Sequence, residues 1–122
     1  MSRIRNRDTK PERITRAVLH ALGFRFRLKP QLLPGKPDIV LTRHKTVVMV
    51  HGCFWHRHKN CRFAYSPKTN RDFWEKKFAG NVARDLAVRR CLRQDGWRVI
   101  VVWACETVHP IGLSRRLQRK LQ

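Results

Sequence analysis

The chain has 122 residues, and 28 lysines and arginines against 8 acidic residues give it a formal net charge of +20. This length allows one domain with a modest core, and the charge argues against a small-molecule enzyme. It suits a nucleic-acid partner, whose phosphates it would neutralise, although a passive basic surface would have the same composition. Without a membrane-length apolar run or an apolar signal core, we expect a cytoplasmic protein, whose four cysteines are thiols or metal ligands rather than disulfides.

The first elements are a basic arm and a helix. We expect one domain over residues 1–122, with residues 1–8 as a flexible arm. Thr9 and Glu12 fit a capping box with proline in the first turn. Apolar residues then recur at helical spacing until Gly23, which is a plausible helix stop.

Three strands follow the first helix. Apolar and basic residues alternate over residues 24–29, which predicts a half-buried strand. A turn rich in proline and glycine over residues 33–37 leads to a strand over residues 38–41. A polar connection then leads to a third strand over residues 46–50, and residues 57–71 have the composition of a loop.

The rest of the chain predicts two helices around a fourth strand. Residues 73–95 form a helix that Gly96 ends, with a buried stripe of Phe78, Val82 and Leu86. Residues 97–103 are the most strand-like run. Residues 110–121 form a short basic helix whose inward residues are Ile111, Leu117 and Leu121. The order α-β-β-β-α-β-α predicts an α/β fold, a mixed sheet flanked by helices.

A metal site is predicted from residues 51–61, which hold three of the six histidines and two of the four cysteines. Imidazole and thiolate are the ligands zinc prefers, and three cysteines with one histidine suit a structural site. The expected ligands are Cys53, His58, Cys61 and Cys105, the last following the final strand. His56 or His109 is an alternative member. Reduced core cysteines with exposed histidines are the competing explanation, and the local density favours metal.

A second metal site is suggested by Asp38, which opens a strand after a proline-containing turn. One carboxylate with backbone and phosphate oxygens is enough for Mg²⁺. An aspartate that only ends a turn is the simpler explanation, but His51 and His56 at the end of the neighbouring strand favour the metal. Glu12 is explained by the capping box; a catalytic role requires its helix start to face Asp38.

Aromatic and basic residues are interleaved in a way that suits DNA binding. Phe54 and Trp55 are neighbours in the predicted metal loop, and Trp74 opens the long helix. Aromatic stacking on bases contributes ~1–3 kcal/mol per base. Core packing is the alternative, but adjacent residues on one loop rarely both face a small core, so we expect one to be exposed. Lys77 and Asn81 lie one helical turn apart, either reaching base edges or phosphates or forming a solvated face.

These residues, taken in order, resemble the very-short-patch-repair (Vsr-type) DNA mismatch endonucleases. The matching segments are Pro37-Asp38, His51-Gly52-Cys53-Phe54-Trp55-His56, Asp72-Phe73-Trp74, Asn81, Arg84-Asp85, and Gly96-Trp97-Arg98-Val99 with Val102-Trp103 and Cys105. The resemblance covers about residues 9–106. It implies a restriction-endonuclease-like fold, related to the PD…(D/E)xK nucleases, in which histidines replace the ExK part.

The resemblance also implies roles for individual residues. Asp38 would ligate Mg²⁺, His56 would be the general base, His51 would support the scissile phosphate or water, and Glu12 would be an accessory acid. Structural zinc would be held by Cys53, His58, Cys61 and Cys105. Phe54, Trp55 and Trp74 would intercalate, and Lys77 and Asn81 would contact the mismatched pair.

The sequence departs from the family pattern at two places. Val50 stands where the family often has threonine; its backbone carbonyl can still ligate Mg²⁺, but a hydroxyl contact is lost. Two residues separate His58 from Cys61, a spacing that differs from the usual form.

The implied function is an endonuclease that nicks one strand of duplex DNA at T:G mismatches arising from 5-methylcytosine deamination. Catalysis would be Mg²⁺-dependent phosphodiester hydrolysis by a monomer, with mismatch-repair proteins as partners. Two alternatives remain: a non-catalytic, zinc-stabilised nucleic-acid-binding module, and a related nuclease with a different DNA target.

Overall fold

The protein folds as an α/β unit in the order predicted from the sequence, with two short 3₁₀ helices added. The computed structural model describes residues 9–28, 37–54 and 56–121. The predicted arm over residues 1–8 and most of the predicted turn over residues 33–37 lie outside the described residues. The elements are α1 (Lys10–Ala21), β1 (Arg27–Leu28), β2 (Ile39–Leu41), η1 (Thr42–His44), β3 (Thr46–His51), α2 (Arg71–Gln94), β4 (Arg98–Trp103), η2 (Ala104–Val108) and α3 (Pro110–Leu121).

The four strands form one mixed sheet in the order β1-β2-β3-β4. β2 is antiparallel to both β1 and β3, with Ile39 opposite Val48. β4 is parallel to β3, and the chain between them contains α2. Two consequences decide where the site lies. The start of β2 is beside the end of β3, and β3 and β4 end at the same edge of the sheet.

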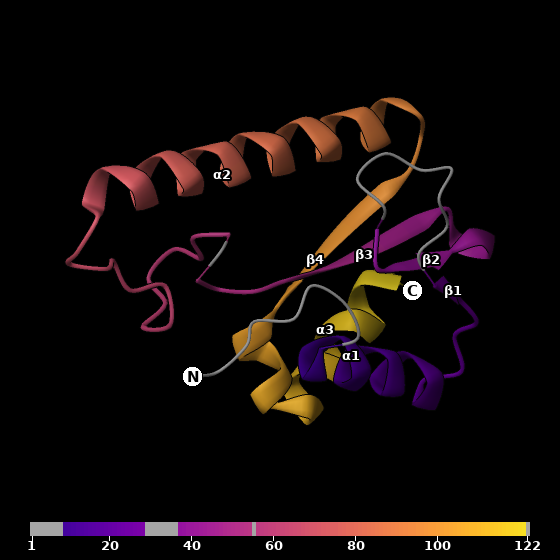
Figure 1. The fold of residues 1–122 in the computed structure, drawn as a ribbon. Coiled ribbons are helices and arrows are strands. Elements are labelled where there is room, and N and C mark those ends of the chain that lie inside the picture. The colour runs from indigo at the N-terminus through magenta and orange to yellow at the C-terminus, as the bar shows by residue number, and fades with distance from the viewer. Residues whose placement is uncertain (1–8, 29–36, 55, 122) are drawn as a thin grey trace.

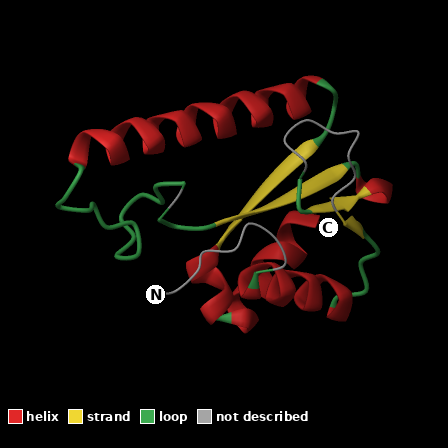
Figure 2. Cartoon of the chain, viewed as in Figure 1, coloured by secondary structure: helices red, strands yellow, loops and turns green. Residues whose placement is uncertain are grey.

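Helices cover both faces of this sheet, so the fold has three layers (Figure 1). α1 and α3 lie together on one face, and α2 runs across the other (Figure 2). Successive side chains of a strand point to opposite faces of the sheet, so β3 and β4 contribute residues to both helical layers. Val48 and Val102 belong to the core shared with α1 and α3, whereas Val47 and Met49 pack with Leu92 of α2.

The helix ends follow the local signals in the sequence. The Oγ1 atom of Thr9 accepts a hydrogen bond from the Glu12 backbone N–H at 3.4 Å, which caps α1. Gly23 and Gly96 follow the ends of α1 and α2, each with φ of +88°. Glycine adopts this left-handed conformation without a steric penalty. The predicted stops at both glycines are therefore confirmed.

Three details of the prediction were wrong. Leu86 is 50% exposed and Ile111 is 73% exposed, although both were expected to be buried. The buried side chains of α3 are instead Leu113, Leu117 and Leu121. Of the strand expected over residues 24–29, only Arg27–Leu28 forms among the described residues, paired with Val40 and Ile39 of β2, and Lys29 lies outside them. Among the described residues, no helix combines the length and the apolar character needed to cross a bilayer.

Candidate active site and metal centre

Most of the predicted site residues gather where β3 and β4 end. The parallel register pairs His51 at the end of β3 with Trp103 at the end of β4. Beyond these ends the chain enters a turn that carries Cys53 and the 3₁₀ helix η2, which carries Cys105. Two segments far apart in the sequence therefore bring their sulfur atoms to the same edge of the sheet.

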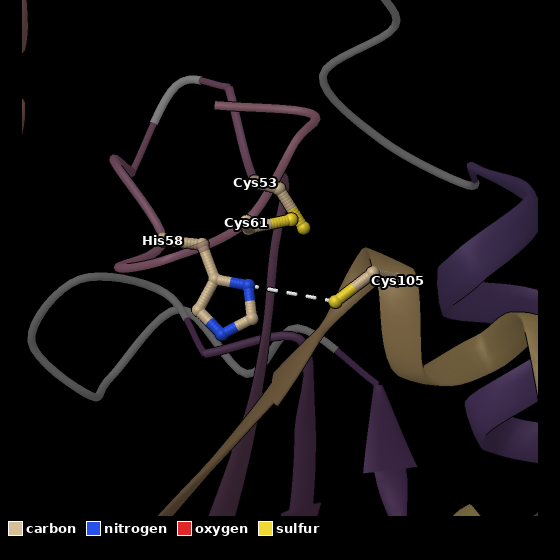
Figure 3. Close-up of side chains that lie close together, drawn as sticks. All are labelled: Cys53, His58, Cys61 and Cys105. Atoms are coloured by element: carbon tan, nitrogen blue, oxygen red, sulfur yellow. Dashed lines mark hydrogen bonds between the residues drawn. The ribbon is translucent and has the colours of Figure 1, made fainter. Parts of the chain in front are cut away.

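The Cys/His cluster consists of Cys53, His58, Cys61 and Cys105, the four residues predicted as zinc ligands. One ligand atom from each lies within 4.8 Å of all the others. Figure 3 shows the side chains from the loop after β3 pointing toward Cys105 of η2. Cys105 Sγ is 3.4 Å from His58 Nδ1. The His58 ring also stacks on Trp103, with ring centroids 4.2 Å apart.

Tight turns fold the loop so that its ligands converge. The backbone N–H of His58 donates to the carbonyl of Cys53 at 3.1 Å. Arg57 and Asn60 adopt the left-handed region, with φ of +52° and +57°. Asparagine tolerates this region better than most residues. The turn at Asn60 accommodates the two residues that separate His58 from Cys61.

The cluster fits zinc in ligand type, number and spacing. Burial and the neighbouring thiols of Cys53 and Cys61 raise the pKa of Cys105 to about 12. Burial also raises the pKa of Cys53. Such thiols ionise readily only with a cation among them. Zn–S bonds of about 2.3 Å in a tetrahedral site hold sulfur atoms roughly 3.8 Å apart, and the ligand atoms here are within 4.8 Å of one another.

A second group, the histidine cluster, consists of His51, His56 and Asp85, whose ligand atoms also lie within 4.8 Å of one another. The two imidazole rings are stacked, with centroids 4.0 Å apart and planes 8° apart. Nδ1 of His56 forms a short hydrogen bond with Oδ2 of Asp85 on α2. His56 is thereby held between β3 and α2 rather than pointing into the Cys/His cluster.

The surroundings of the histidine cluster determine which of its side chains are charged. Burial, followed by the charge of His56, lowers the pKa of His51 to about 4. His51 is therefore neutral near pH 7. Burial opposes ionisation of Asp85, but the hydrogen bond with His56 lowers its pKa below the usual value. A carboxylate at Asp85 holds the proton of His56 on Nδ1, which leaves the Nε2 lone pair as the basic site of the neutral ring.

Asp38 is placed beside the end of β3 by the antiparallel pairing of β2. Its Oδ2 atom accepts a hydrogen bond from the backbone N–H of Val50 at 2.7 Å. Val50 immediately precedes His51, so the carboxylate, the Val50 backbone and the histidine cluster are neighbours. The expected proximity of Asp38 to the strand end that carries His51 is thus observed.

Glu12 lies in the first turn of α1 and is only 5% exposed. Its helix packs against β3, η2 and α3. Burial of a glutamate is uncommon unless other polar groups stabilise it. The N-cap at Thr9 explains the backbone position of Glu12, and the role of its carboxylate as an accessory acid stays a prediction.

Phe54 packs against the first turns of α2, and Trp55 lies outside the described residues. The Phe54 ring makes edge contacts with Trp74 and Phe78, at centroid distances of 5.6 and 5.1 Å. It also lies 4.9 Å from the ring of the exposed Tyr65. The predicted wedge residues Phe54 and Trp74 therefore belong to one aromatic group that joins the metal loop to α2.

Lys77 and Asn81 lie on the amino-terminal half of α2. Lys77 is exposed and Asn81 is half-buried. Asn81 Oδ1 accepts a hydrogen bond from Arg84 Nη1 at 3.4 Å.

Asp85 belongs to the Arg84-Asp85 segment of the family resemblance, but no role was predicted for it. The sequence contains one signal that could have identified it: Asp85 is an acidic residue seven positions beyond the apolar Phe78 in the predicted long helix. A spacing of seven residues returns a helix to nearly the same face.

The family model described as "DNA mismatch endonuclease Vsr" matches residues 1–62. Type II nicking enzyme V.XorIIP of Xanthomonas oryzae pv. oryzae is 45% identical over 121 residues, covering 99% of this chain and 88% of the relative. Type II nicking enzyme V.NmeAIP of Neisseria meningitidis is 44% identical, covering 98% and 84%. DNA mismatch endonuclease Vsr of Escherichia coli is 40% identical, covering 97% and 78%. The chain therefore belongs to the Vsr family of DNA mismatch endonucleases.

Proposed function

We propose that this protein nicks one strand of duplex DNA at T:G mismatches that arise when 5-methylcytosine is deaminated. The observation that carries the proposal is the histidine cluster next to Asp38 in a chain of the Vsr family. The names of the relatives, a mismatch endonuclease and type II nicking enzymes, support hydrolysis of a DNA strand. The net charge of +20 supports a polyanionic substrate.

His56 is the proposed general base. Its hydrogen bond to Asp85 fixes the ring and keeps the proton on Nδ1. Nε2 then takes a proton from the attacking water, a contribution of typically ~10²–10⁴-fold in rate. His51 is stacked on His56 and is neutral. A neutral imidazole can hydrogen-bond the scissile phosphate or the water, and this is its proposed role.

Asp38 and the backbone carbonyl of Val50 are the proposed Mg²⁺ ligands. The carboxylate is held in place by the Val50 N–H, and one carboxylate with a carbonyl, waters and phosphate oxygens meets the needs of this ion. Bound Mg²⁺ would polarise the phosphate and stabilise its developing negative charge. Glu12 is proposed as an accessory acid near the same end of the sheet.

Structural zinc at Cys53, His58, Cys61 and Cys105 is proposed to hold the loop that carries Phe54 and His56. The convergence of the four ligand atoms within 4.8 Å supports this role. Phe54, Trp55 and Trp74 are proposed to wedge into the base stack, which is easiest to open at a mismatch. Lys77 and Asn81 are proposed to contact the mismatched pair.

The test is a nicking assay on duplexes of one sequence that carry each mismatch in turn, with and without Mg²⁺. We expect strand-specific nicking of T:G in Mg²⁺ and little cleavage of paired DNA. Mg²⁺-dependent cleavage of a different site would instead favour the second candidate, a nuclease with another target, to which the type II nicking relatives lend support. DNA binding without any cleavage would overturn both and favour a binding module.

A further inference from the structure

A cavity of about 380 Å³ opens on the side of α2, and no member of the two clusters already described lines it. Its lining residues are Leu86, Arg89, Arg90, Arg93 and Gln94. Among these described lining residues, three are arginines and none is acidic. Residues three and four apart lie on one side of a helix, so the arginines present their guanidinium groups to a common space. We call this surface the arginine groove.

Arg89 connects the arginine groove to the histidine cluster. It lies one helical turn beyond Asp85 on α2, close enough for its positive charge to act on both Asp85 and His51. Its Nε atom is buried and has no hydrogen-bond partner within the described part of the chain. A buried donor without a partner is unfavourable, so an acceptor that reached it from the groove would remove this penalty.

The chemistry of the groove favours phosphate. Guanidinium groups bind phosphate oxygens through paired, parallel N–H donors, and are weakly hydrated compared with an ammonium group. Arg90 and Arg93 are exposed and can meet a large ligand from solvent. Leu86, which is 50% exposed, offers an apolar contact of the kind a deoxyribose ring makes.

We propose that the arginine groove binds backbone phosphates of the DNA substrate, flanking the strand that is cut. This inference rests on the proposed function, because Asp85, one helical turn before Arg89, belongs to the proposed catalytic cluster. The eight steps of the helix from Asp85 to Arg93 span roughly 12 Å. At ~3.4 Å of rise per nucleotide on one strand, the groove reaches phosphates about two to four nucleotides from the scissile bond.

The test is the salt dependence of DNA affinity for the double variant Arg90→Ala/Arg93→Ala. Each lost phosphate contact should reduce the slope of log K against log salt by about 0.9, so the expected reduction is close to 2. Affinity at low salt should fall roughly 10–100-fold, equally for matched and T:G duplexes. Arg115→Ala, an exposed arginine on α3, is the matched control and should leave the slope unchanged.

A second arm locates the phosphates. Duplexes with uncharged methylphosphonates two to four nucleotides from the nick should weaken the wild type and add little to the defect of the double variant. Equal slopes of log K against log salt for the double variant and Arg115→Ala, with normal melting temperatures, would overturn the inference. The arginine groove would then favour an acidic protein as its partner. A wild type that binds and nicks normally in that experiment keeps the proposed function, whereas failure of the wild type to nick any duplex refutes that function separately.

Discussion

The imidazole of His56 is hydrogen-bonded to the carboxylate of Asp85, a residue 29 positions further along the chain. This hydrogen bond joins the loop after β3 to the middle of α2. The ring of His51, at the end of β3, stacks on the face of the same His56 imidazole. The proposed base therefore has a fixed orientation and a fixed tautomer before any substrate arrives. Preorganisation of this kind reduces the cost of reaching the transition state.

Asp85→Asn should slow nicking by roughly 10²–10⁴-fold, the range in which general base catalysis contributes. An amide preserves the shape of the side chain but cannot hold the His56 proton on Nδ1 in the same way. Single-turnover nicking rates give the effect, and zinc content should stay unchanged. Asp95→Asn, at the exposed C-cap of α2, is the control. Equal rates for the two variants would remove Asp85 from catalysis.

His56→Ala and His58→Ala should have opposite effects. The first should lose ~10²–10⁴-fold in nicking rate and keep its zinc, because His56 is bonded to Asp85 rather than to the Cys/His cluster. The second should lose zinc, because His58 lies 3.4 Å from Cys105 Sγ. Elemental analysis and nicking assays on both variants decide the matter. A zinc loss in His56→Ala with full zinc in His58→Ala would exchange the two assignments.

Purified protein should contain one zinc per chain, and Cys105→Ser should remove it. Zinc in small peptide sites contributes ~10–16 kcal/mol of apparent binding energy, so its loss should lower the melting temperature steeply. Zinc binding should also release protons, since the pKa of the Cys105 thiol is about 12 without metal, and zinc affinity should fall as the pH is lowered. Cys91→Ser is the control, because Cys91 is an exposed thiol on α2. Full zinc content in Cys105→Ser would contradict the ligand set.

Asp38→Asn should reduce nicking in Mg²⁺ by roughly 10³-fold or more, because stabilisation by the metal is worth several kcal/mol. The asparagine oxygen still accepts the Val50 N–H, so the fold and DNA affinity should be retained. A raised Mg²⁺ requirement would accompany the loss if the carboxylate binds the ion. Asp72→Asn, exposed in the first turn of α2, should behave as the wild type. Wild-type nicking by Asp38→Asn would refute the metal assignment.

Trp55→Ala should lower the preference for T:G over paired DNA with little effect on the melting temperature. Phe54→Ala should lower both, because Phe54 packs edge-on against Trp74 and Phe78. Aromatic pairs contribute about 0.5–1.5 kcal/mol each, so a loss of roughly 1–3 kcal/mol is expected. Phe63→Ala, a 46% exposed residue on the same loop, is the control. If Trp55→Ala keeps its mismatch preference but loses much of its stability, Trp55 is a core residue and not a wedge.

Local signals predicted the elements well because they act through neighbouring residues. Thr9 caps α1, and Gly23 and Gly96 end helices by conformations that glycine adopts freely. It was harder to predict which side chains of a helix face the core. A step of four residues turns a helix by about 400°, so the stripe from Phe78 to Leu86 drifts by roughly 80° and leaves the buried face. Ile111 lies roughly 120° from Leu117 by the same arithmetic.

The convergence of the candidate site was predicted in part because Cys53 and Cys105 each lie two residues beyond the end of a strand. The ends of β3 and β4 meet through a parallel register, which brings Cys53 and Cys105 to one edge. The partnership of His56 with Asp85 was not predictable, because a loop of unspecified geometry separates them. Which of His56 and His58 would face the cysteines depended on the turns at Arg57 and Asn60, which the sequence does not reveal.

The two bonds that define the site join residues 29 and 47 positions apart. Contacts between such distant residues carry the loop-closure entropy of the whole intervening chain, so they depend on the folded tertiary structure. A partly unfolded chain keeps the basic composition that attracts DNA, but in it the proposed base and the Cys/His cluster are not assembled. When α2 undocks from the sheet, we therefore expect nicking activity to be lost before DNA adhesion.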